Sequence, residues 1–187
     1  MARTMGFGGR SGEICQMAYV VKDIDEAIAW WIEKMGVGPW FVLDSFGGEG
    51  HVFRGKPCTS YVKIAMSFAG SMNIELLQCL DDEPSVYKET VDRVGYGFHH
   101  FGLAIDGDEI EDEVKRRVAK GEVLAHRAPV PTGGSVAYFE GGAMRNGTVS
   151  PGFVELIPAT AGMDAGFTAF WQQTRDWDGK DPIRPFG

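Results

Sequence analysis

Apolar and polar positions in the first half of the chain predict one strand, one helix and three further strands. Ile14–Val21 is a mostly apolar, β-rich run that is typical of a buried strand. Asp23, with Glu26 three residues later, resembles a capping box, and apolar residues at helical spacing continue from there to Gly36. Further strands are expected at Trp40–Ser45, Tyr61–Ala69 and Met72–Cys79. The glycine-rich segment Phe46–Pro57, between the first two of these, is expected to be a loop.

The same order of elements returns in the second half. A short helix that Ser85 caps and Gly95 ends is predicted to lead into it. A second long helix is expected over Asp108–Lys120, because its apolar residues share one stripe, its acids gather at the start and its bases at the end. Strands are expected at Phe98–Asp106, near Val123–Arg127, and at Ser135–Glu140 and Gly152–Pro158. Each half is therefore predicted to be a β-α-β-β-β unit.

These units suggest how the chain is organised. With 44% apolar residues, the chain can fill one ordinary core or two small fused modules. We expect an N-terminal tail over 1–12, a first βαβββ module over 13–83, a linking helix with the second module over 84–160, and a C-terminal helix and tail over 161–187. Trp177 and Phe186 could hold that tail on the body. The expected fold class is α+β.

The two units also match in the sequence of their first and last strands. Gln16–Asp23 leads into the first long helix, and His100–Asp106 leads into the second. Ile74–Leu77, near the end of the first unit, matches Val154–Ile157 at the end of the second, after nearly equal separations. A duplicated module is therefore predicted, and residues at matching points of the two copies have to be considered together.

Four polar residues interrupt these strands at matching points: Gln16, Glu75, His100 and Glu155. Residues two positions away share their face of the sheet and are largely apolar, so the four side chains are expected to point into the core. A single strand glutamate is most often on the solvent face, and a single histidine is most often a satisfied core residue. The twofold arrangement favours a metal site, because a divalent cation balances two buried carboxylates that would otherwise be costly.

Composition and charge exclude several classes of function. The chain has 187 residues with 18 Lys and Arg against 26 Asp and Glu, and a formal charge of −8 repels nucleic acid and anionic membrane surfaces. No run approaches the roughly 18 apolar residues of a membrane span, and the N-terminus lacks the apolar run of a signal peptide. Three cysteines without CxxC spacing are typical of a reduced chain. We therefore expect a cytoplasmic protein with no nucleic-acid or membrane partner.

Together these units resemble the vicinal oxygen chelate superfamily, which includes glyoxalase I, methylmalonyl-CoA epimerase, extradiol dioxygenases and bleomycin-resistance proteins. The resemblance covers about Glu13 to Pro158, and its strongest fragments are Gln16–Asp23 with its helix, Gly97–Asp106 and Pro151–Pro158. It implies a glyoxalase-like incomplete barrel of two βαβββ modules, here with a C-terminal helical extension. It also implies that Gln16, Glu75, His100 and Glu155 are the metal ligands, and that the protein forms a homodimer.

The resemblance implies a chemistry as well. Three oxygen ligands and one imidazole suit Mg, Mn, Co, Ni or Zn and leave places for a substrate with a carbonyl and a vicinal oxygen. The metal would hold the enolate formed when a proton leaves the carbon next to the carbonyl, as in an isomerase, epimerase or lyase. Glu155 is the expected catalytic base, because the corresponding glutamate serves in glyoxalase relatives, and Glu75 is the expected second group.

Two alternatives stay open. Glyoxalase I acts on a glutathione hemithioacetal and requires a cationic pocket, for which Arg54 and Lys56 are the only nearby suggestion. A bleomycin-resistance-type protein would sequester a ligand without catalysis, although such binders generally lack the four ligands. Methylmalonyl-CoA epimerases usually carry His and Gln where this chain has Gln16 and Glu75. Extradiol dioxygenases need two histidine ligands, so that branch is disfavoured.

Other conspicuous side chains are expected to be structural. His99 should point to the face opposite His100, as a surface or helix-packing residue, and Cys15 should be a small buried residue facing away from Gln16. Arg54 is expected to be solvated if no anionic substrate contacts it. Trp30, Trp31 and Trp40 are expected in the core, and no role is expected for His51 and His126.

Overall fold

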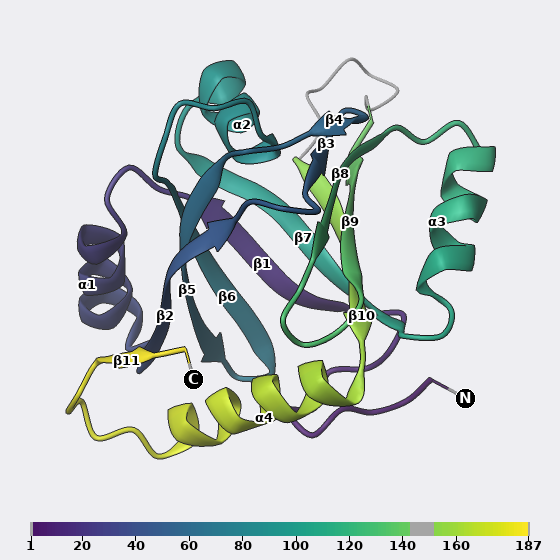
Figure 1. Cartoon of the computed structure of the whole chain (residues 1–187). Helices are drawn as coiled ribbons and strands as arrows, with labels where there is room; N and C mark the ends of the chain where they lie inside the picture. Colours follow the sequence, from purple (N-terminus) through teal and green to yellow (C-terminus); the bar gives the residue numbers. More distant parts are fainter. Residues whose placement is uncertain (1, 143–151, 187) are drawn as a thin grey trace.

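The computed structural model describes residues 2–142 and 152–186 and contains two successive units of the predicted kind (Figure 1). The first unit comprises β1 (Ile14–Val20), α1 (Ile24–Met35), β2 (Trp40–Gly47), β5 (Tyr61–Ala69) and β6 (Met72–Cys79). After α2 (Val86–Val94), the second comprises β7 (Gly97–Asp106), α3 (Ile110–Ala119), β8 (Leu124–Pro129), β9 (Ser135–Glu140) and β10 (Phe153–Ala159). The remaining elements are β3 (Val52–Phe53), β4 (Lys56–Pro57), α4 (Ala161–Arg175) and β11 (Ile183–Pro185). Pro151, the first residue of the third matching fragment, lies outside the described residues.

All the strands described belong to one curled sheet in the order β11-β2-β5-β6-β1-β7-β10-β9-β8-β3-β4. Each unit contributes four neighbouring strands, β2-β5-β6-β1 and β7-β10-β9-β8, and the two sets join where β1 pairs antiparallel with β7. The sheet curls without closing, and α4 lies across one end of it (Figure 1). The expected α+β fold, an incomplete barrel with a C-terminal helix, is confirmed.

The local signals that start and end the helices act as the sequence indicates. The Asp23 carboxylate accepts hydrogen bonds from the backbone N–H groups of Asp25 and Glu26, and the Ser85 hydroxyl accepts one from Lys88. Gly36 ends α1 in the left-handed conformation, with φ of 64°, which favours glycine. These ends fix where β1 and β6 lie relative to their covering helices.

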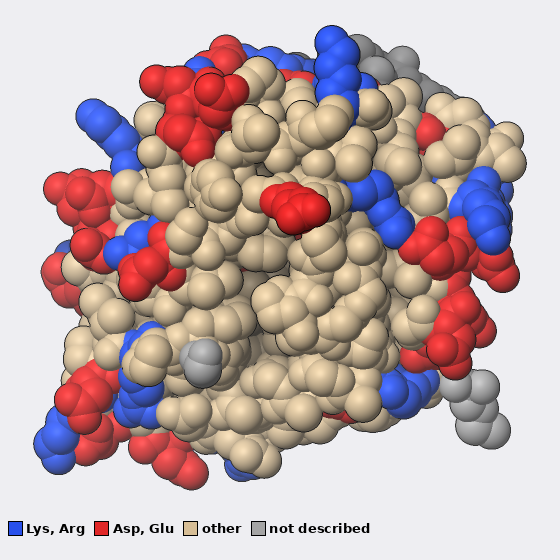
Figure 2. All heavy atoms as spheres, in the orientation of Figure 1, with Lys and Arg blue, Asp and Glu red and all other residues tan. Residues whose placement is uncertain are grey.

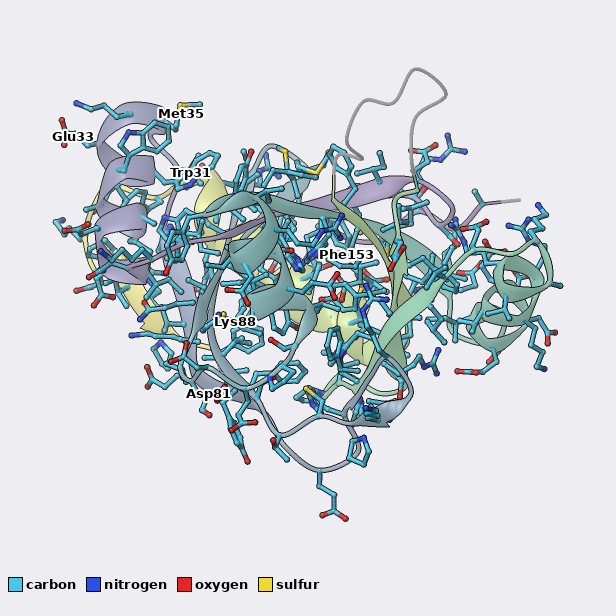
Figure 3. All side chains as sticks on the ribbon, turned by 90° about the horizontal axis from the view of Figure 1, so that it is seen from above. Trp31, Glu33, Met35, Asp81, Lys88 and Phe153 are labelled. Atoms are coloured by element: carbon cyan, nitrogen blue, oxygen red, sulfur yellow. The ribbon has the colours of Figure 1, made fainter. Side chains whose placement is uncertain are left out.

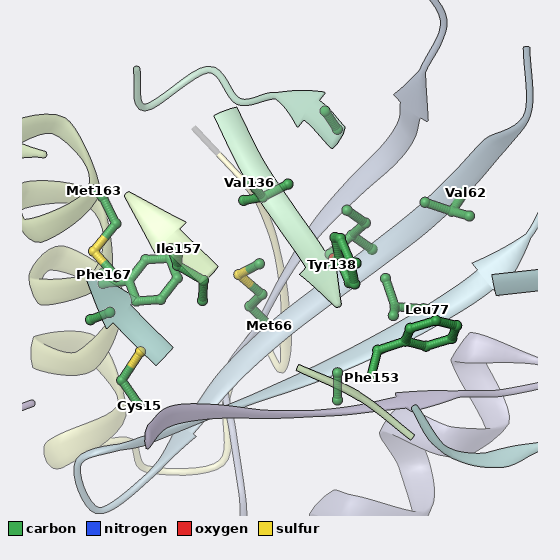
Figure 4. Packing of buried hydrophobic residues seen from close by; sticks show 14 of the residues in the cluster. Cys15, Val62, Met66, Leu77, Val136, Tyr138, Phe153, Ile157, Met163 and Phe167 are labelled. Carbon is green, nitrogen blue, oxygen red and sulfur yellow. The ribbon is translucent and has the colours of Figure 1, made fainter. Parts of the chain in front are cut away.

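The helices α1 and α3 cover the outside of the curled sheet, and a separate core fills the inside. Ile24 and Ile28 of α1 pack with residues of β5 and β6, while Ile110 and Val114 of α3 pack with residues of β9 and β10. The inner cluster includes Met66, Ile157, Met163 and Phe167, so α4 helps to fill the barrel (Figure 4). In the view from above, Phe153 lies between the two halves, whereas Glu33 and Met35 lie at the outer end of α1 (Figure 3).

The tryptophans of α1 and β2 do not share one environment. Trp40 is fully buried, and its indole N–H donates to the Val37 carbonyl oxygen. Trp31 is partly buried against the same cluster. Trp30 is 51% exposed, so the prediction that it lies in the core is wrong. It is adjacent to the apolar stripe of α1 but faces outward, because the stripe is only about 100° wide.

The segment Phe46–Pro57 is not the loop that was expected. β2 continues to Gly47, and β3 and β4 form a short hairpin. β3 belongs to the first unit in sequence but pairs antiparallel with β8 of the second unit, with Val52 opposite Arg127. β8 lies far from β3 in the sequence, so the local composition indicated the turns of this segment but not its strands.

Arg54 fastens this hairpin to α2 and to the second unit through ion pairs at the surface. It has a left-handed φ of 46°, and its N–H donates to the Ala125 carbonyl oxygen at 2.8 Å. Its guanidinium donates to both carboxylate oxygens of Glu89 in α2, at 2.7 and 2.8 Å, and to Glu140 at 2.6 Å. The Arg54 side chain is 37% exposed, so it contacts solvent as expected and is also held by ion pairs that the sequence did not indicate.

The C-terminal tail is held on the body, as the aromatic residues suggested, and it also contains a strand. β11 pairs parallel with β2, and the backbone N–H of Trp40 donates to the Pro182 carbonyl oxygen. Phe186 packs against Phe170, which stacks on Phe41 at 4.0 Å between ring centroids. Within the two described ranges, none of the helices combines the length and apolar character needed to cross a bilayer.

Candidate metal centre

The four polar residues singled out in the sequence lie on the four central strands. Gln16 is in β1, Glu75 in β6, His100 in β7 and Glu155 in β10, and these strands are consecutive neighbours in the sheet. All four residues are buried, with exposed fractions of 5% or less. The apolar neighbours that share their face, including Ala18 of β1, belong to the inner cluster. The duplicated strands thus bring the four side chains together inside the barrel.

Their polar atoms converge on the His100 ring. His100 Nε2 lies 2.9 Å from Glu155 Oε2, 3.5 Å from Glu75 Oε2 and 3.0 Å from Gln16 Oε1. One potential ligand atom from each of Glu75, His100 and Glu155 lies within 4.8 Å of the others. This spacing allows several donor atoms to reach one ion.

Two β-bulges prepare the site. The β1–β7 register shifts between Ile14 and Gln16 and again between Ala18 and Tyr19, which leaves Cys15 and His99 as the extra residues. Each extra residue directly precedes a residue of the site, in β1 and in β7. Because a bulge turns an additional side chain out of strict alternation, both residues lie inside: Cys15 is in the inner cluster and His99 contacts His100. The predictions that Cys15 faces away from Gln16 and that His99 points opposite His100 are wrong, although both residues are buried and His99 does pack against α2.

His99 determines which nitrogen of His100 carries a proton. His99 Nε2 lies 3.3 Å from the Val86 carbonyl oxygen, which can only accept, so this nitrogen carries the His99 proton. Burial lowers the pKa of His99 well below its ordinary value, so the ring is neutral and its Nδ1 is an acceptor. His100 Nδ1 therefore donates to His99 Nδ1 at 2.7 Å. His100 Nε2, the other ring nitrogen, faces the two carboxylates and the Gln16 amide oxygen.

Gln16 is also oriented by a hydrogen bond, so that its oxygen faces the site. Its Nε2 donates to Asn73 Oδ1 at 3.0 Å, and Asn73 Nδ2 donates to the Ser67 carbonyl oxygen at 3.1 Å. Gln16 therefore presents its carbonyl oxygen to His100. The approach requires Gly102 in β7, because a Cβ there would lie 2.8 Å from Gln16 Oε1 and 2.6 Å from the Ile157 side chain.

The site thus contains four groups that can act as metal ligands, and the two buried carboxylates among them are unfavourable unless a cation balances their charge. Burial and the nearby Glu155 raise the pKa of Glu75 well above its ordinary value. Glu75 Oε2 has no hydrogen-bond partner among the described residues. Two carboxylates, one amide oxygen and one imidazole nitrogen suit a hard or borderline divalent ion. The residues present fit such an ion.

A cavity of about 90 Å³ adjoins three of the four groups: Gln16, Glu75 and Glu155 line it. Two tyrosines, Tyr87 from α2 and Tyr138 from β9, bring their rings to its wall. Burial, and then the nearby glutamates, raise the pKa of both tyrosines, so both hydroxyls are protonated. The other lining residues are Leu43, Phe46, Ile64, Met66, Val130, Pro131, Thr132, Val136, Ile157, Met163, Phe167 and Phe186.

Comparison with known families identifies the architecture. A family model described as the Glyoxalase/Bleomycin resistance protein/Dioxygenase superfamily matches residues 15–139, about two thirds of the chain and three of the four polar residues of the site. The chain belongs to this superfamily. The predicted resemblance is confirmed at this level. A search of curated proteins finds no match.

Solved structures with the superfamily fold resemble this chain at low sequence identity. Methylmalonyl-CoA epimerase from Mycobacterium tuberculosis is 17% identical, with a TM-score of 0.56, over 81% of this chain and 91% of that chain. A methylmalonyl-CoA epimerase from Streptomyces coelicolor in complex with 2-nitronate-propionyl-CoA is 16% identical, with a TM-score of 0.55, over 81% and 96%. A hypothetical protein from Bacillus halodurans is 18% identical, with a TM-score of 0.53, over 77% and 91%. At these identities the likeness shows the fold alone.

Several side chains around the site were missed by the sequence analysis. Tyr87 and Tyr138 line the cavity, Asn73 orients Gln16, and His99 orients His100. Asn73 lies two positions before Glu75 in β6, so its place on the inner face could have been found from strand alternation. Nothing in the local sequence distinguishes the two tyrosines from ordinary core residues of this superfamily fold.

Proposed function

We propose that the protein is a metal-dependent enzyme that removes a proton from the carbon next to a carbonyl group, as an isomerase, epimerase or lyase working through an enolate. The observation that carries this proposal is the convergence of four buried groups that can act as metal ligands at the inner end of an apolar cavity. Methylmalonyl-CoA epimerases with the same fold provide a precedent for such proton transfer.

In this proposal Gln16, Glu75, His100 and Glu155 would hold the ion. When bound, the ion supplies positive charge that polarises a substrate oxygen and stabilises the enolate. The apolar wall excludes water, which strengthens that electrostatic effect. His99 and Asn73 keep His100 and Gln16 oriented for binding.

Proton transfer is assigned to the two glutamates. Glu155 lines the cavity and accepts the proton from the substrate carbon. Glu75 lines the same cavity from the first unit and is the second group, which returns a proton to the substrate. Gln16 cannot be the second proton-transfer group, because its amide does not accept a proton. This role is therefore assigned to Glu75.

The proposal is tested by metal analysis and by solvent-deuterium exchange. We expect the purified protein to contain about one divalent ion per chain and to exchange a carbon-bound proton in some member of a panel of α-hydroxyketones, α-keto thioesters and hemithioacetals. Substituting Glu155→Gln should lower the exchange rate by about 10²- to 10⁴-fold, because the general base is lost. The metal content of this variant should persist, since three ligands and an amide oxygen are left.

Glu13→Gln is the matched control, because Glu13 is exposed and does not line the cavity. It should exchange protons at the rate of the parent protein. Normal exchange by Glu155→Gln would show that another residue is the base. A protein that binds no divalent ion would contradict the proposed function itself.

A further inference from the structure

Among the residues that the structure describes, the wall of the cavity is uncharged apart from the two glutamates of the candidate metal centre. Its remaining polar side chains are the hydroxyls of Tyr87, Tyr138 and Thr132, and all its other lining residues except Gln16 are apolar. The wall draws on both units and on the C-terminal extension, which contributes Met163, Phe167 and Phe186. An anionic group on a substrate would therefore meet hydroxyls and hydrocarbon in this wall.

Three basic residues near the hairpin and the outer strands have acidic partners. Arg54 is held by Glu89 and Glu140, and Arg127 pairs with Glu111. Lys63 lies 3.8 Å from Asp25 and 3.5 Å from Asp44. In the orientation of Figure 1, the middle of the front face is largely uncharged and most charged residues lie around its margin (Figure 2).

The charge balance of the site with a bound divalent ion also favours an uncharged substrate. Glu75 and Glu155 together would neutralise a divalent ion, and His99 contacts the His100 nitrogen that faces away from the carboxylates. A substrate carboxylate would add an unbalanced negative charge to an apolar interior, which costs several kcal/mol in proteins. A neutral substrate adds none.

The size of the cavity limits the reacting group. Its volume of about 90 Å³ is smaller than the roughly 150 Å³ cavity that accommodates a benzene molecule in another protein. The cavity therefore favours a compact reacting group over a bulky one.

We infer that the site acts on a compact, uncharged α-hydroxycarbonyl group, with the hydroxyls of Tyr87, Tyr138 and Thr132 as neutral hydrogen-bond partners, and that it discriminates against substrates carrying a carboxylate on that group. This inference rests on the proposed function for the reaction, but the selection against negative charge is a property of the cavity wall and can be measured separately.

The test compares hydroxypyruvate with 1-hydroxy-3-methyl-2-butanone. In the second compound an uncharged isopropyl group of similar size replaces the carboxylate. Hydroxyacetone serves as a smaller neutral ligand. Binding to the purified protein is measured by saturation-transfer NMR, and proton exchange is measured in D₂O. We expect both neutral compounds to bind at least tenfold more tightly than hydroxypyruvate. Equal or tighter binding of hydroxypyruvate, or failure of all three compounds to bind, would overturn the inference.

A charge placed in the wall gives a second test. Thr132→Lys introduces a cation into the cavity while keeping the backbone carbonyl that accepts the Thr160 hydroxyl hydrogen bond. This variant should bind hydroxypyruvate at least tenfold more tightly than the parent protein does. Val123→Lys, at an exposed position outside the cavity, adds the same charge and should leave the preference unchanged. An unchanged preference in Thr132→Lys would overturn the inference.

The two proposals fail in different ways. Binding of the neutral compounds without any proton exchange contradicts the proposed function and leaves the inferred selectivity standing. Exchange that is faster with hydroxypyruvate than with its isopropyl counterpart contradicts the selectivity and supports the reaction.

Discussion

His99 acts on the metal centre through its neighbour and not by direct contact with the converging oxygens. It accepts a hydrogen bond from His100 Nδ1 and donates one to the Val86 carbonyl oxygen in α2. The backbone of a helix therefore sets the proton positions of two successive imidazoles. Outer hydrogen bonds of this kind orient metal ligands and increase their basicity, so His99 is a positioning residue for His100.

We predict that His99→Phe weakens the binding of a divalent ion by about 10- to 100-fold. The phenyl ring preserves the packing against Tyr87 and Phe153 but cannot accept the hydrogen bond from His100 Nδ1. Affinity is measured by titration against a competing chelator. Phe153→Leu, which alters the same packing and leaves the hydrogen bonds intact, should bind the ion as the parent does. Equal affinity in His99→Phe would show that His100 is oriented without His99.

His126 is a second buried imidazole, and it is less well satisfied. It lies in β8 with a 1% exposed fraction, and neither ring nitrogen has a hydrogen-bond partner among the described residues. Burial, and then the neighbouring His51, lower the pKa of His126 to about 4. The folded state therefore resists protonation of this ring, and its contribution to stability is present above the ordinary pKa of 6.5 and is lost as the pH falls toward 4.

Replacing His126 by Phe should make the protein less sensitive to acid. The stability of the variant relative to the parent should rise by up to about 3 kcal/mol as the pH falls from 7 to 4, because the variant has no imidazole to protonate at this position. Urea unfolding at several pH values measures the difference. A constant difference across this range would show that His126 is protonated equally easily in the folded and unfolded chains.

At the scale of elements, the β3–β4 hairpin links the two units. It leaves the first unit after β2 and adds to the edge of β8 in the second. Arg54 then connects the hairpin to α2 and to the end of β9. These contacts tie together three elements that the duplication alone would leave separate.

Arg54→Gln should destabilise the protein by only about 1 kcal/mol, because the guanidinium is 37% exposed and water screens its ion pairs. The local effect should be larger. Hydrogen exchange of the Arg54 N–H, which donates to the Ala125 carbonyl oxygen, should become faster relative to amides of β1 and β7. Lys56→Gln in the same hairpin is the control. Unchanged exchange in Arg54→Gln would show that the backbone pairing suffices.

The elements also show which structural features could be predicted from the sequence. Asp23 and Gly36 defined α1 because caps act locally, and the matching positions of Gln16 and His100 indicated a shared interior because strand alternation is regular. The bulges at Cys15 and His99 could not be predicted, because they depend on the β1–β7 register. β3 was missed for the same reason: only its distant partner β8 makes it a strand. The sequence therefore predicted which residues face inward but not the hydrogen bonds that orient them.

On the scale of the whole molecule, the candidate centre lies where the two units join. Gln16 and Glu75 come from the first, and His100 and Glu155 come from the second. An ion bound by all four would favour the folded, joined state over the unfolded chain. Bound metal and global stability should consequently be coupled.

Removing the metal with a chelator should therefore lower the melting temperature by about 10 °C. An ion present at a thousand times its dissociation constant contributes about 4 kcal/mol, and each kcal/mol shifts the midpoint by roughly 2–4 °C at this chain length. Differential scanning calorimetry with and without chelator measures the change. The double variant Glu75→Gln/Glu155→Gln should not respond. An unchanged midpoint in the metal-containing parent would contradict coupling between the ion and the fold.

The β3–β8 pairing breaks the equivalence of the two copies. The outer edge of β2 is covered by β11, whereas the outer edge of β8 is covered by a strand borrowed from the other unit. An excised segment 84–160 would lack that strand and would present the backbone groups of β8 to solvent. Exposed edges of this kind pair readily with other chains, so the isolated second copy is expected to self-associate and could not rebuild an intact barrel simply by pairing with itself.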